Sequence, residues 1–358
     1  LEDKLAVALQ ILDMEPWDFF MCVLGEADAA SHHFWRFMDA RSPRYCRDDS
    51  LATVILRAYQ RLDAFLGEVM RRSDGDTVIM VVSDHGFTGA GIHQASLNRY
   101  LEECGWLSRR RHPAAGVKQM LLRAVPATSR ARLARQFPRL FGGLEARARM
   151  GGIDWSRTRA WSEELSYFPS ARLNLAGRDP DGIVPPEKYR ETVMELAALL
   201  EAWEPVRRAV PRWECFDMPG QEFAPDLIIE PAAVNGYPWG FCRRQAGPST
   251  RILDQDSYAG GREQGFNGVH RNPAFFAANV SCGAAAPSLT DITPTVLGLF
   301  GLPAEGLDGS DLLAAGKKSF PSRSNKGLFP ESAKVHRRLT PREEAELEDR
   351  LRRMGYLD

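Results

Sequence analysis

The stretch that most constrains the fold runs from residue 78 to residue 87, with the sequence VIMVVSDHGF. It opens with an apolar, β-branched run, which is typical of a buried strand in an α/β protein. The run stops at Ser83, Asp84 and His85 follow at once, and Gly86 predicts a sharp backbone turn. Because open α/β sheets bind ligands beyond the carboxyl ends of their strands, Asp84 and His85 are well placed for chemistry. The alternative is an ordinary turn with a capping Asp and a chance His.

A second cluster of the same kind follows residues 17–24, an apolar run that predicts another strand. Asp28 and His32 come shortly after it, four residues apart, so they share one face if a helix begins there. His33 points elsewhere by helical phase, and we do not count it as a ligand. Each cluster therefore offers a carboxylate oxygen and an imidazole nitrogen, a mixture that suits zinc or manganese.

The order of predicted elements favours a sheet built through crossover helices. Amphipathic helices are predicted over residues 1–14 and 50–72, alternating with the strands at 17–24 and 78–82. Helix, strand, helix, strand implies parallel pairing. Further predicted strands cover 171–175, 225–229 and 274–280, and further helices cover 97–105, 187–203 and 291–300.

A third imidazole, His270, precedes the predicted strand at 274–280, and a loop can bring it over the sheet edge. It completes a set of five candidate metal ligands: Asp28, His32, Asp84, His85 and His270. One zinc uses three or four ligands, whereas two metal ions about 4 Å apart commonly clamp a phosphoryl group. Such a pair would need roughly one more carboxylate and a nucleophile. We assign structural or outer roles to five other polar residues: His93, Asn98, Asp226, Asn267 and Asp291.

Composition excludes several classes of function. The chain is 44% hydrophobic and 26% charged with a net charge of -1, which does not suggest a partner such as nucleic acid or an anionic membrane. No apolar run approaches the roughly 18 residues needed to span a bilayer. The six cysteines form no Cys-x-x-Cys pair, and Cys22, inside an apolar run, is expected to be a buried thiol.

One segment departs from the near-neutral charge of the whole chain. Residues 109–149 contain about eleven Lys or Arg and one acid, Glu145. We favour a solvated basic face on an inserted helical cap; the alternative is a lid that attracts an anionic substrate. The predicted organisation has four parts: a first part of the α/β domain at 1–107, the basic cap at 108–152, the remainder of that domain at 153–315, and a tail with a terminal helix at 316–358.

The ordered motifs resemble the type I phosphodiesterase/nucleotide pyrophosphatase family of the alkaline phosphatase superfamily, over nearly the whole chain. They are Asp28–Trp35, Ser83–Phe87, Leu97-Asn98 with Leu101, Asp154–Ala160, Asn174–Arg178, Gly182–Val184, Pro225–Leu227, Gly268–His270, Asp291–Thr295, Asp308-Gly309 and the closing helix to Gly355–Leu357. The Ser-Asp-His-Gly motif alone is moderately specific, and the ordered series is highly specific.

The resemblance implies a largely parallel sheet flanked by helices, with two divalent metal ions, zinc or manganese. It implies that residues matching Asp28, His32 and His270 hold one ion, and that Asp84 and His85 help to hold the other. The family's remaining Asp and its Ser or Thr nucleophile are expected before Leu1, so this chain is expected to be a nearly inactive fragment of an enzyme that works through a phospho-enzyme.

Several alternatives stay open at this point. A sulfatase or phosphomutase of the same superfamily, or a non-catalytic metal-binding relative, would share these motifs. The expected partner is a small phosphate ester, while the oligomeric state stays undetermined. An N-terminal targeting signal is not observable, and the cytoplasm is the favoured location.

Overall fold

The structure is a computed structural model that describes residues 1–14, 16–110, 152–164, 168–216, 223–244, 246–254, 266–283 and 286–313. Two compact units divide the chain. The first comprises Leu1–Arg110 and Ile153–Val280, and the described part of the second consists of Gly152 and residues 281–283 and 286–313. Most of the basic cap and all of the tail predicted from sequence, including its terminal helix, lie outside the described residues. No helix among the described residues is long and apolar enough to cross a membrane.

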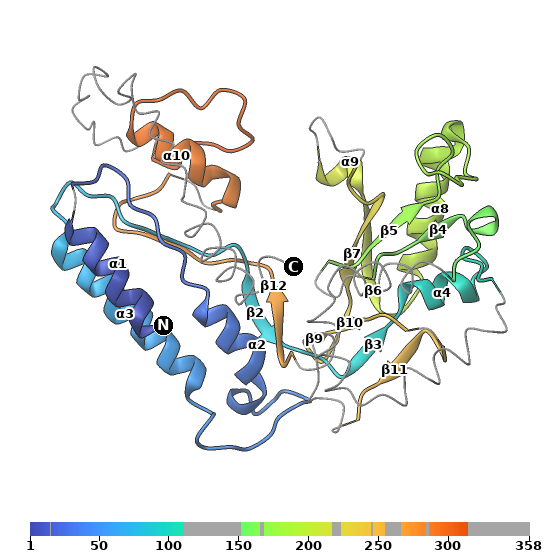
Figure 1. Cartoon of the computed structure of the whole chain (residues 1–358), viewed down its shortest axis with the longest axis horizontal. Coiled ribbons are helices and arrows are strands. Elements are labelled where there is room, and N and C mark those ends of the chain that lie inside the picture. The colour runs from blue at the N-terminus through green and yellow to red at the C-terminus, as the bar shows by residue number, and fades with distance from the viewer. Residues whose placement is uncertain are drawn as a thin grey trace, which may run out of the picture. The chain divides into compact units, whose positions relative to one another are not determined.

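The predicted helices that fall on described residues are confirmed with small shifts at their ends (Figure 1). The first unit contains α1 (Glu2–Met14), α2 (Glu26–Met38), α3 (Val54–Arg72), α4 (Leu97–Glu103), α8 (Tyr189–Glu201) and the short α9 (Arg212–Cys215), with single 3-10 turns at Trp155–Arg157 and Pro186–Lys188. In the second unit, a 3-10 turn at Leu289–Asp291 leads into α10 (Ile292–Leu299).

The strands pair mainly antiparallel, so the expectation of a largely parallel sheet is wrong for the described residues. The antiparallel pairs are β1 (Met80–Val82) with β13 (Phe276–Ala278), β2 (Gly86–Gly89) with β12 (Gly268–Arg271), and β8 (Ala233–Val234) with β9 (Tyr237–Pro238). A three-stranded sheet places β3 (His93–Ala95) between β10 (Gly240–Phe241), which is parallel to it, and β11 (Thr250–Ile252), which is antiparallel. The order of elements along a chain does not say which strands become neighbours, and here segments distant in sequence pair.

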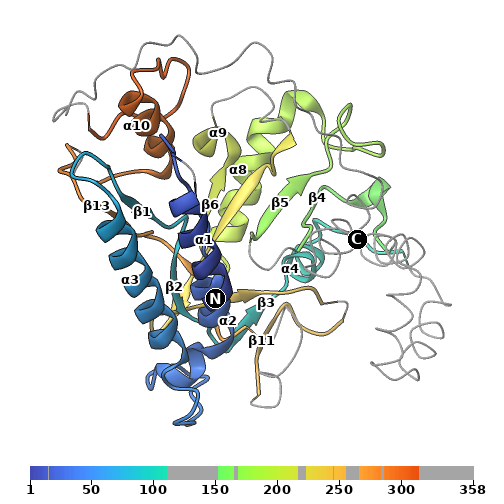
Figure 2. The same ribbon diagram turned by 60° about the vertical axis from the view of Figure 1, so that its left-hand side comes forward.

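The best-buried core lies around a four-stranded antiparallel sheet in the first unit. Its order is β4 (Ala160–Trp161), β5 (Ser170–Leu173), β7 (Leu227–Pro231) and β6 (Val206–Pro211). Leu173 and Leu227 have no exposed surface, and neither do Leu196 and Leu200 on the apolar face of α8. Figure 2 shows α8 running alongside β6. This burial anchors the sheet, because each such side chain contributes about 1.5–3 kcal/mol relative to an exposed one.

The apolar run at residues 17–24 is not a strand, contrary to the prediction. It is extended but belongs to no ladder of the described residues. Met21 and Val23 are 72% and 69% exposed, and Cys22, expected to be buried, is exposed. An apolar sequence selects an extended backbone locally, but a strand also needs a neighbour that accepts and donates its main-chain hydrogen bonds.

Candidate metal centre

Helix α2 carries the first two candidate ligands. Asp28 and His32 lie one turn apart, and His32 Nε2 is 3.6 Å from Asp28 Oδ1. The other ring nitrogen of His32, Nδ1, lies 2.8 Å from the main-chain oxygen of Gly268, which accepts its proton. With Nδ1 protonated, Nε2 carries the lone pair that a metal ligand needs. The helix thus presents a carboxylate oxygen and an oriented imidazole on one face, as the spacing predicted.

The β2–β12 ladder brings in the other two imidazoles. His270 lies within β12 opposite Phe87, and its ring stacks on that of His85 with centroids 3.5 Å apart. Two expectations need correction here. His270 belongs to a strand of its own rather than to a loop, and Gly86 begins β2 rather than forming a sharp turn. Glycine is needed at position 86 because a Cβ there would clash with the main-chain oxygen of Pro273.

The five predicted ligands therefore come together in space. Asp28 Oδ1 lies 3.3 Å from Nε2 of His270 and 3.8 Å from Nε2 of His85, and the Nε2 atoms of His32 and His270 are 3.0 Å apart. Asp84 lies at the edge, with its Oδ1 3.5 Å from His85 Nε2 and 74% of its side chain exposed. Among the described residues, Asp28, His85 and His270 form one group that could hold a metal ion, since their ligand atoms all lie within 4.8 Å of one another.

The residues fit a cation. Asp28 Oδ1 is shielded from solvent and has no hydrogen-bond partner among the described residues, although 43% of the side chain is exposed. The Nδ1 atoms of His32 and His85 both lie on main-chain oxygens, so their Nε2 lone pairs face inward. Lone pairs that converge on a shielded carboxylate oxygen repel one another unless a cation or a proton lies between them. Mixed nitrogen and oxygen ligands suit zinc or manganese.

Burial, together with the neighbouring charges of His85 and His32, lowers the pKa of His270. The carboxylate of Asp28 acts in the opposite direction, and burial outweighs it. The neutral imidazole is the form that binds a metal ion, so the surroundings of His270 favour the ligand form of the side chain.

Aromatic rings pack around the imidazoles, and sequence reasoning missed them. Phe87 lies edge-on to His32 and His270, with ring centroids 4.8 and 5.3 Å away. Phe266 stacks on His32 at 4.4 Å. Such rings exclude water and fix ring orientation. The packing of Phe87 against the imidazoles could have been predicted from its place directly after the Ser-Asp-His-Gly motif. No sequence motif marks Phe266.

The residues assigned outer roles have structural partners elsewhere. The ring of His93 lies 5.0 Å from that of Trp239, and Asn98 Nδ2 donates to the main-chain oxygen of Ser162. Asp226 is fully buried and accepts hydrogen bonds from Arg178.

Two further residues support backbone near the ends of elements. Asp291 accepts the main-chain N–H groups of Ser288 and Ser310. Asn267 donates from Nδ2 to the main-chain oxygen of His33, so it ties β12 to α2. His33 itself lies edge-on to Phe266 and makes no ligand contact among the described residues.

Comparison with known proteins places most of the chain in a known family. The model of the family described as type I phosphodiesterase / nucleotide pyrophosphatase matches residues 1–234. The match includes Asp28, His32, Asp84 and His85, while His270 lies beyond it and joins them through the β2–β12 ladder. Searches of curated proteins and of solved structures return no match.

Proposed function

The chain belongs to the type I phosphodiesterase/nucleotide pyrophosphatase family, and from that premise we propose that it is built for metal-dependent hydrolysis of phosphate esters. The observation that supports this is the convergence of three imidazoles on the shielded Oδ1 atom of Asp28. The family match supports hydrolysis of phosphoric esters, and the metal requirement rests on the geometry of these side chains. Phosphodiesters and nucleotide pyrophosphates are the proposed substrate class.

We assign the ligands to two divalent ions, with zinc the first choice. Asp28, His32 and His270 would hold one ion, because their ligand atoms lie 3.0, 3.3 and 3.6 Å from one another. Asp84 and His85 would contribute to the second. When bound, such ions polarise the phosphoryl oxygens and stabilise the negative charge that develops on them. The imidazoles contribute neutral lone pairs, and the Phe87 ring beside them limits access of water.

The nucleophile of a phospho-enzyme mechanism is not evident among the described residues of the site. Ser31, next to His32, is 1% exposed, so it cannot reach a substrate. The hydroxyl of Ser83, next to Asp84, accepts the main-chain N–H of Phe275 at 2.7 Å. We therefore propose that the attacking hydroxyl and a further carboxylate ligand come from outside this group, and we expect this chain to bind metal with little or no turnover.

Metal analysis of three variants tests the site. We expect His270→Ala and His85→Ala each to lower bound zinc, because each removes a ligand that faces Asp28. His93→Ala is the matched control, since His93 packs against Trp239 instead. Zinc stoichiometry after dialysis, measured by mass spectrometry, gives the readout. Unchanged zinc content in both ligand variants would refute the assignment.

A panel of nitrophenyl phosphate monoesters and diesters tests the nucleophile. We expect rates at the background of the metal-free solution. Hydrolysis above background that His270→Ala abolishes would contradict the proposal that the hydroxyl comes from elsewhere, while supporting the hydrolase assignment. Zinc binding with no hydrolysis is the expected pair of results.

A further inference from the structure

Arg44 is a buried cation that contacts neutral main-chain groups next to the metal centre. It is 4% exposed, and its guanidinium donates from Nε and Nη2 to the oxygen of Gly91 at 3.0 and 2.7 Å. From Nη1 it donates to the oxygen of Phe266 at 2.8 Å. Arg44 follows α2, Gly91 follows β2, and Phe266 precedes β12. One side chain therefore joins α2, which carries Asp28 and His32, to β12, which carries His270, and to the end of β2, the strand that directly follows Asp84 and His85.

The segment that Arg44 holds at Phe266 controls the position of His32. The Phe266 ring stacks on the imidazole at 4.4 Å and 28°. The next residue, Asn267, donates its main-chain N–H to the oxygen of His32 at 2.7 Å, and Gly268 accepts from His32 Nδ1 at 2.8 Å. Three consecutive residues thus fix the ring face, the backbone and one ring nitrogen of the same histidine.

The contact to Gly91 holds the end of β2 against the start of β12. Ala90 donates its N–H to the oxygen of Asn267 at 2.9 Å. The segment after β2 and the segment before β12 are therefore joined by this main-chain bond as well as by the side chain of Arg44. The fit is tight, because a Cβ on Gly91 would clash with the main-chain oxygen of Pro238. Through the β2–β12 register, a shift of either strand would separate His85 from His270.

A guanidinium suits this task better than other side chains. Burying a charge is unfavourable unless it is well hydrogen-bonded, and an apolar residue of similar volume is often as stable or more stable. A planar fork reaches two carbonyl groups in fixed directions, which a lysine ammonium does not. We propose that Arg44 is a positioning residue: by joining Gly91 and Phe266 it orients His32 and His270 toward the metal centre.

The test compares Arg44→Met and Arg44→Lys with Arg251→Met. Arg251 also donates Nε and Nη2 to a neutral oxygen, that of Gln94, but on the β3–β11 ladder. Co²⁺ binding is followed by titration and by its d–d absorption. We expect Arg44→Met to weaken Co²⁺ binding about 10- to 100-fold and to change the spectrum, Arg44→Lys to fall between, and Arg251→Met to stay within about twofold of wild type.

A second readout needs no metal. Long-range ¹H–¹⁵N spectra report which ring nitrogen of His32 carries the proton. We expect the Nδ1–H form in wild type and in Arg251→Met, and a mixture of tautomers in Arg44→Met. Wild-type affinity, cobalt spectrum and tautomer in Arg44→Met would overturn the proposal. If Arg44→Met does not fold, Arg44→Lys decides: a changed cobalt spectrum with an unchanged circular dichroism spectrum supports positioning, and a wild-type spectrum overturns it.

The metal part of this proposal rests on the proposed function, and the two can fail separately. Absence of Co²⁺ binding by the wild-type chain would count against the metal centre itself. The tautomer of His32 in the Arg44 variants would still decide whether Arg44 orients that side chain.

Discussion

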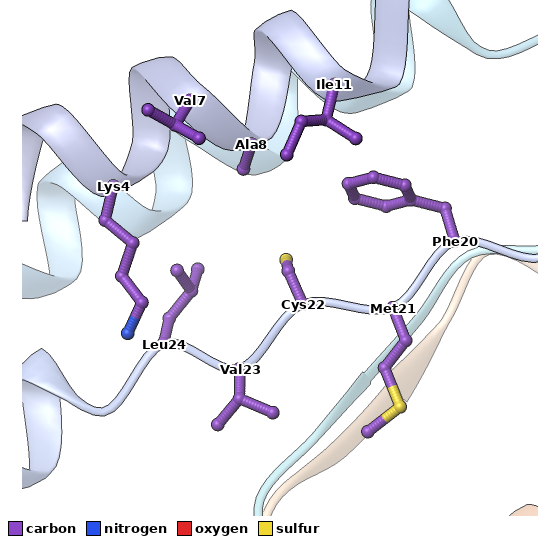
Figure 3. Close-up of a pocket in the computed structure, with 9 residues that line it drawn as sticks. All are labelled: Lys4, Val7, Ala8, Ile11, Phe20, Met21, Cys22, Val23 and Leu24. Atoms are coloured by element: carbon purple, nitrogen blue, oxygen red, sulfur yellow. The ribbon is translucent and has the colours of Figure 1, made fainter. Parts of the chain in front are cut away.

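β12 and residues 17–24 are both extended segments of the first unit, but only β12 is paired with another strand of the described residues. β12 pairs with β2 over four residues and is packed against α2. The 17–24 segment is more apolar, yet it enters no ladder of the described residues. In Figure 3 its side chains alternate as in a strand: Cys22 and Leu24 point toward α1, whereas Met21 and Val23 point away. The segment and α1 line an apolar pocket of about 280 Å³.

The difference shows what hydrogen-bonding partners add to hydrophobicity. In β12, the main chain is paired on the β2 side, and Gly268 and Asn267 also bond to His32. Such contacts fix side chains to within a few tenths of an ångström, which a metal site requires. Residues 17–24 contact α1 mainly through apolar side chains, apart from one hydrogen bond from Trp17 Nε1 to the main-chain oxygen of Leu12. Apolar contact is non-directional. Polar contacts therefore define the site, whereas the mainly apolar contacts of residues 17–24 leave Met21 and Val23 exposed.

The largest combined effect, on stability and on zinc binding together, is expected from Gly268→Val. A Cβ at Gly268 would clash with the main-chain oxygen of Ser31, so the substitution forces α2 away from β12. We expect a loss of about 3 kcal/mol in the free energy of unfolding, the upper end for overpacking, together with loss of zinc binding. Urea unfolding and metal analysis measure both.

The matched control is Gly67→Ala, on α3, where a Cβ would meet nothing within 4 Å. Here we expect a gain of about 0.5–1 kcal/mol from helix propensity. If Gly268→Val were tolerated as well as Gly67→Ala, close packing of α2 on β12 would not be what defines the site.

The pH dependence of stability tests polar burial at a third place, the buried acid Glu164, which lies outside both β12 and residues 17–24. Glu164 accepts hydrogen bonds from the Ser96 hydroxyl and the Asn98 N–H, but burial outweighs them and raises its pKa. A raised folded-state pKa means that its stabilising contribution is complete below the unfolded value of about 4.3 and is lost as pH rises through the folded value.

We therefore expect Glu164→Gln, which keeps an acceptor oxygen and cannot ionise, to gain in free energy of unfolding relative to wild type as pH rises from about 4 toward neutrality. Urea unfolding of both proteins across this range gives the difference. A difference that is constant with pH would contradict the raised pKa, and a decreasing one would mean that hydrogen bonding to the carboxylate dominates.

The smallest effect is expected from Val23→Thr in the unpaired segment. The side chain is 69% exposed, so we expect a change within about 0.5 kcal/mol. Leu173→Ala in β5 is the contrast: that leucine has no exposed surface, and we expect a loss of about 2–5 kcal/mol. A large loss from Val23→Thr would show that residues 17–24 are packed in solution.

The local part of the site could be predicted from the sequence, and the long-range part could not. The four-residue spacing of Asp28 and His32 gave their common helical face, and an apolar run before Asp84 and His85 gave their place after β1. The strand that carries His270, its register against Phe87, and the stacking of Phe266 on His32 depend on contacts more than 170 residues apart. Periodicity is a local signal and does not specify such pairing.

The partner that orients His32 is the main-chain oxygen of Gly268. A main-chain acceptor is present whatever amino acid occupies the position, so no point mutation deletes it directly. Side chains around the centre can therefore change while this imidazole keeps its direction, as long as the backbone of β12 stays in register.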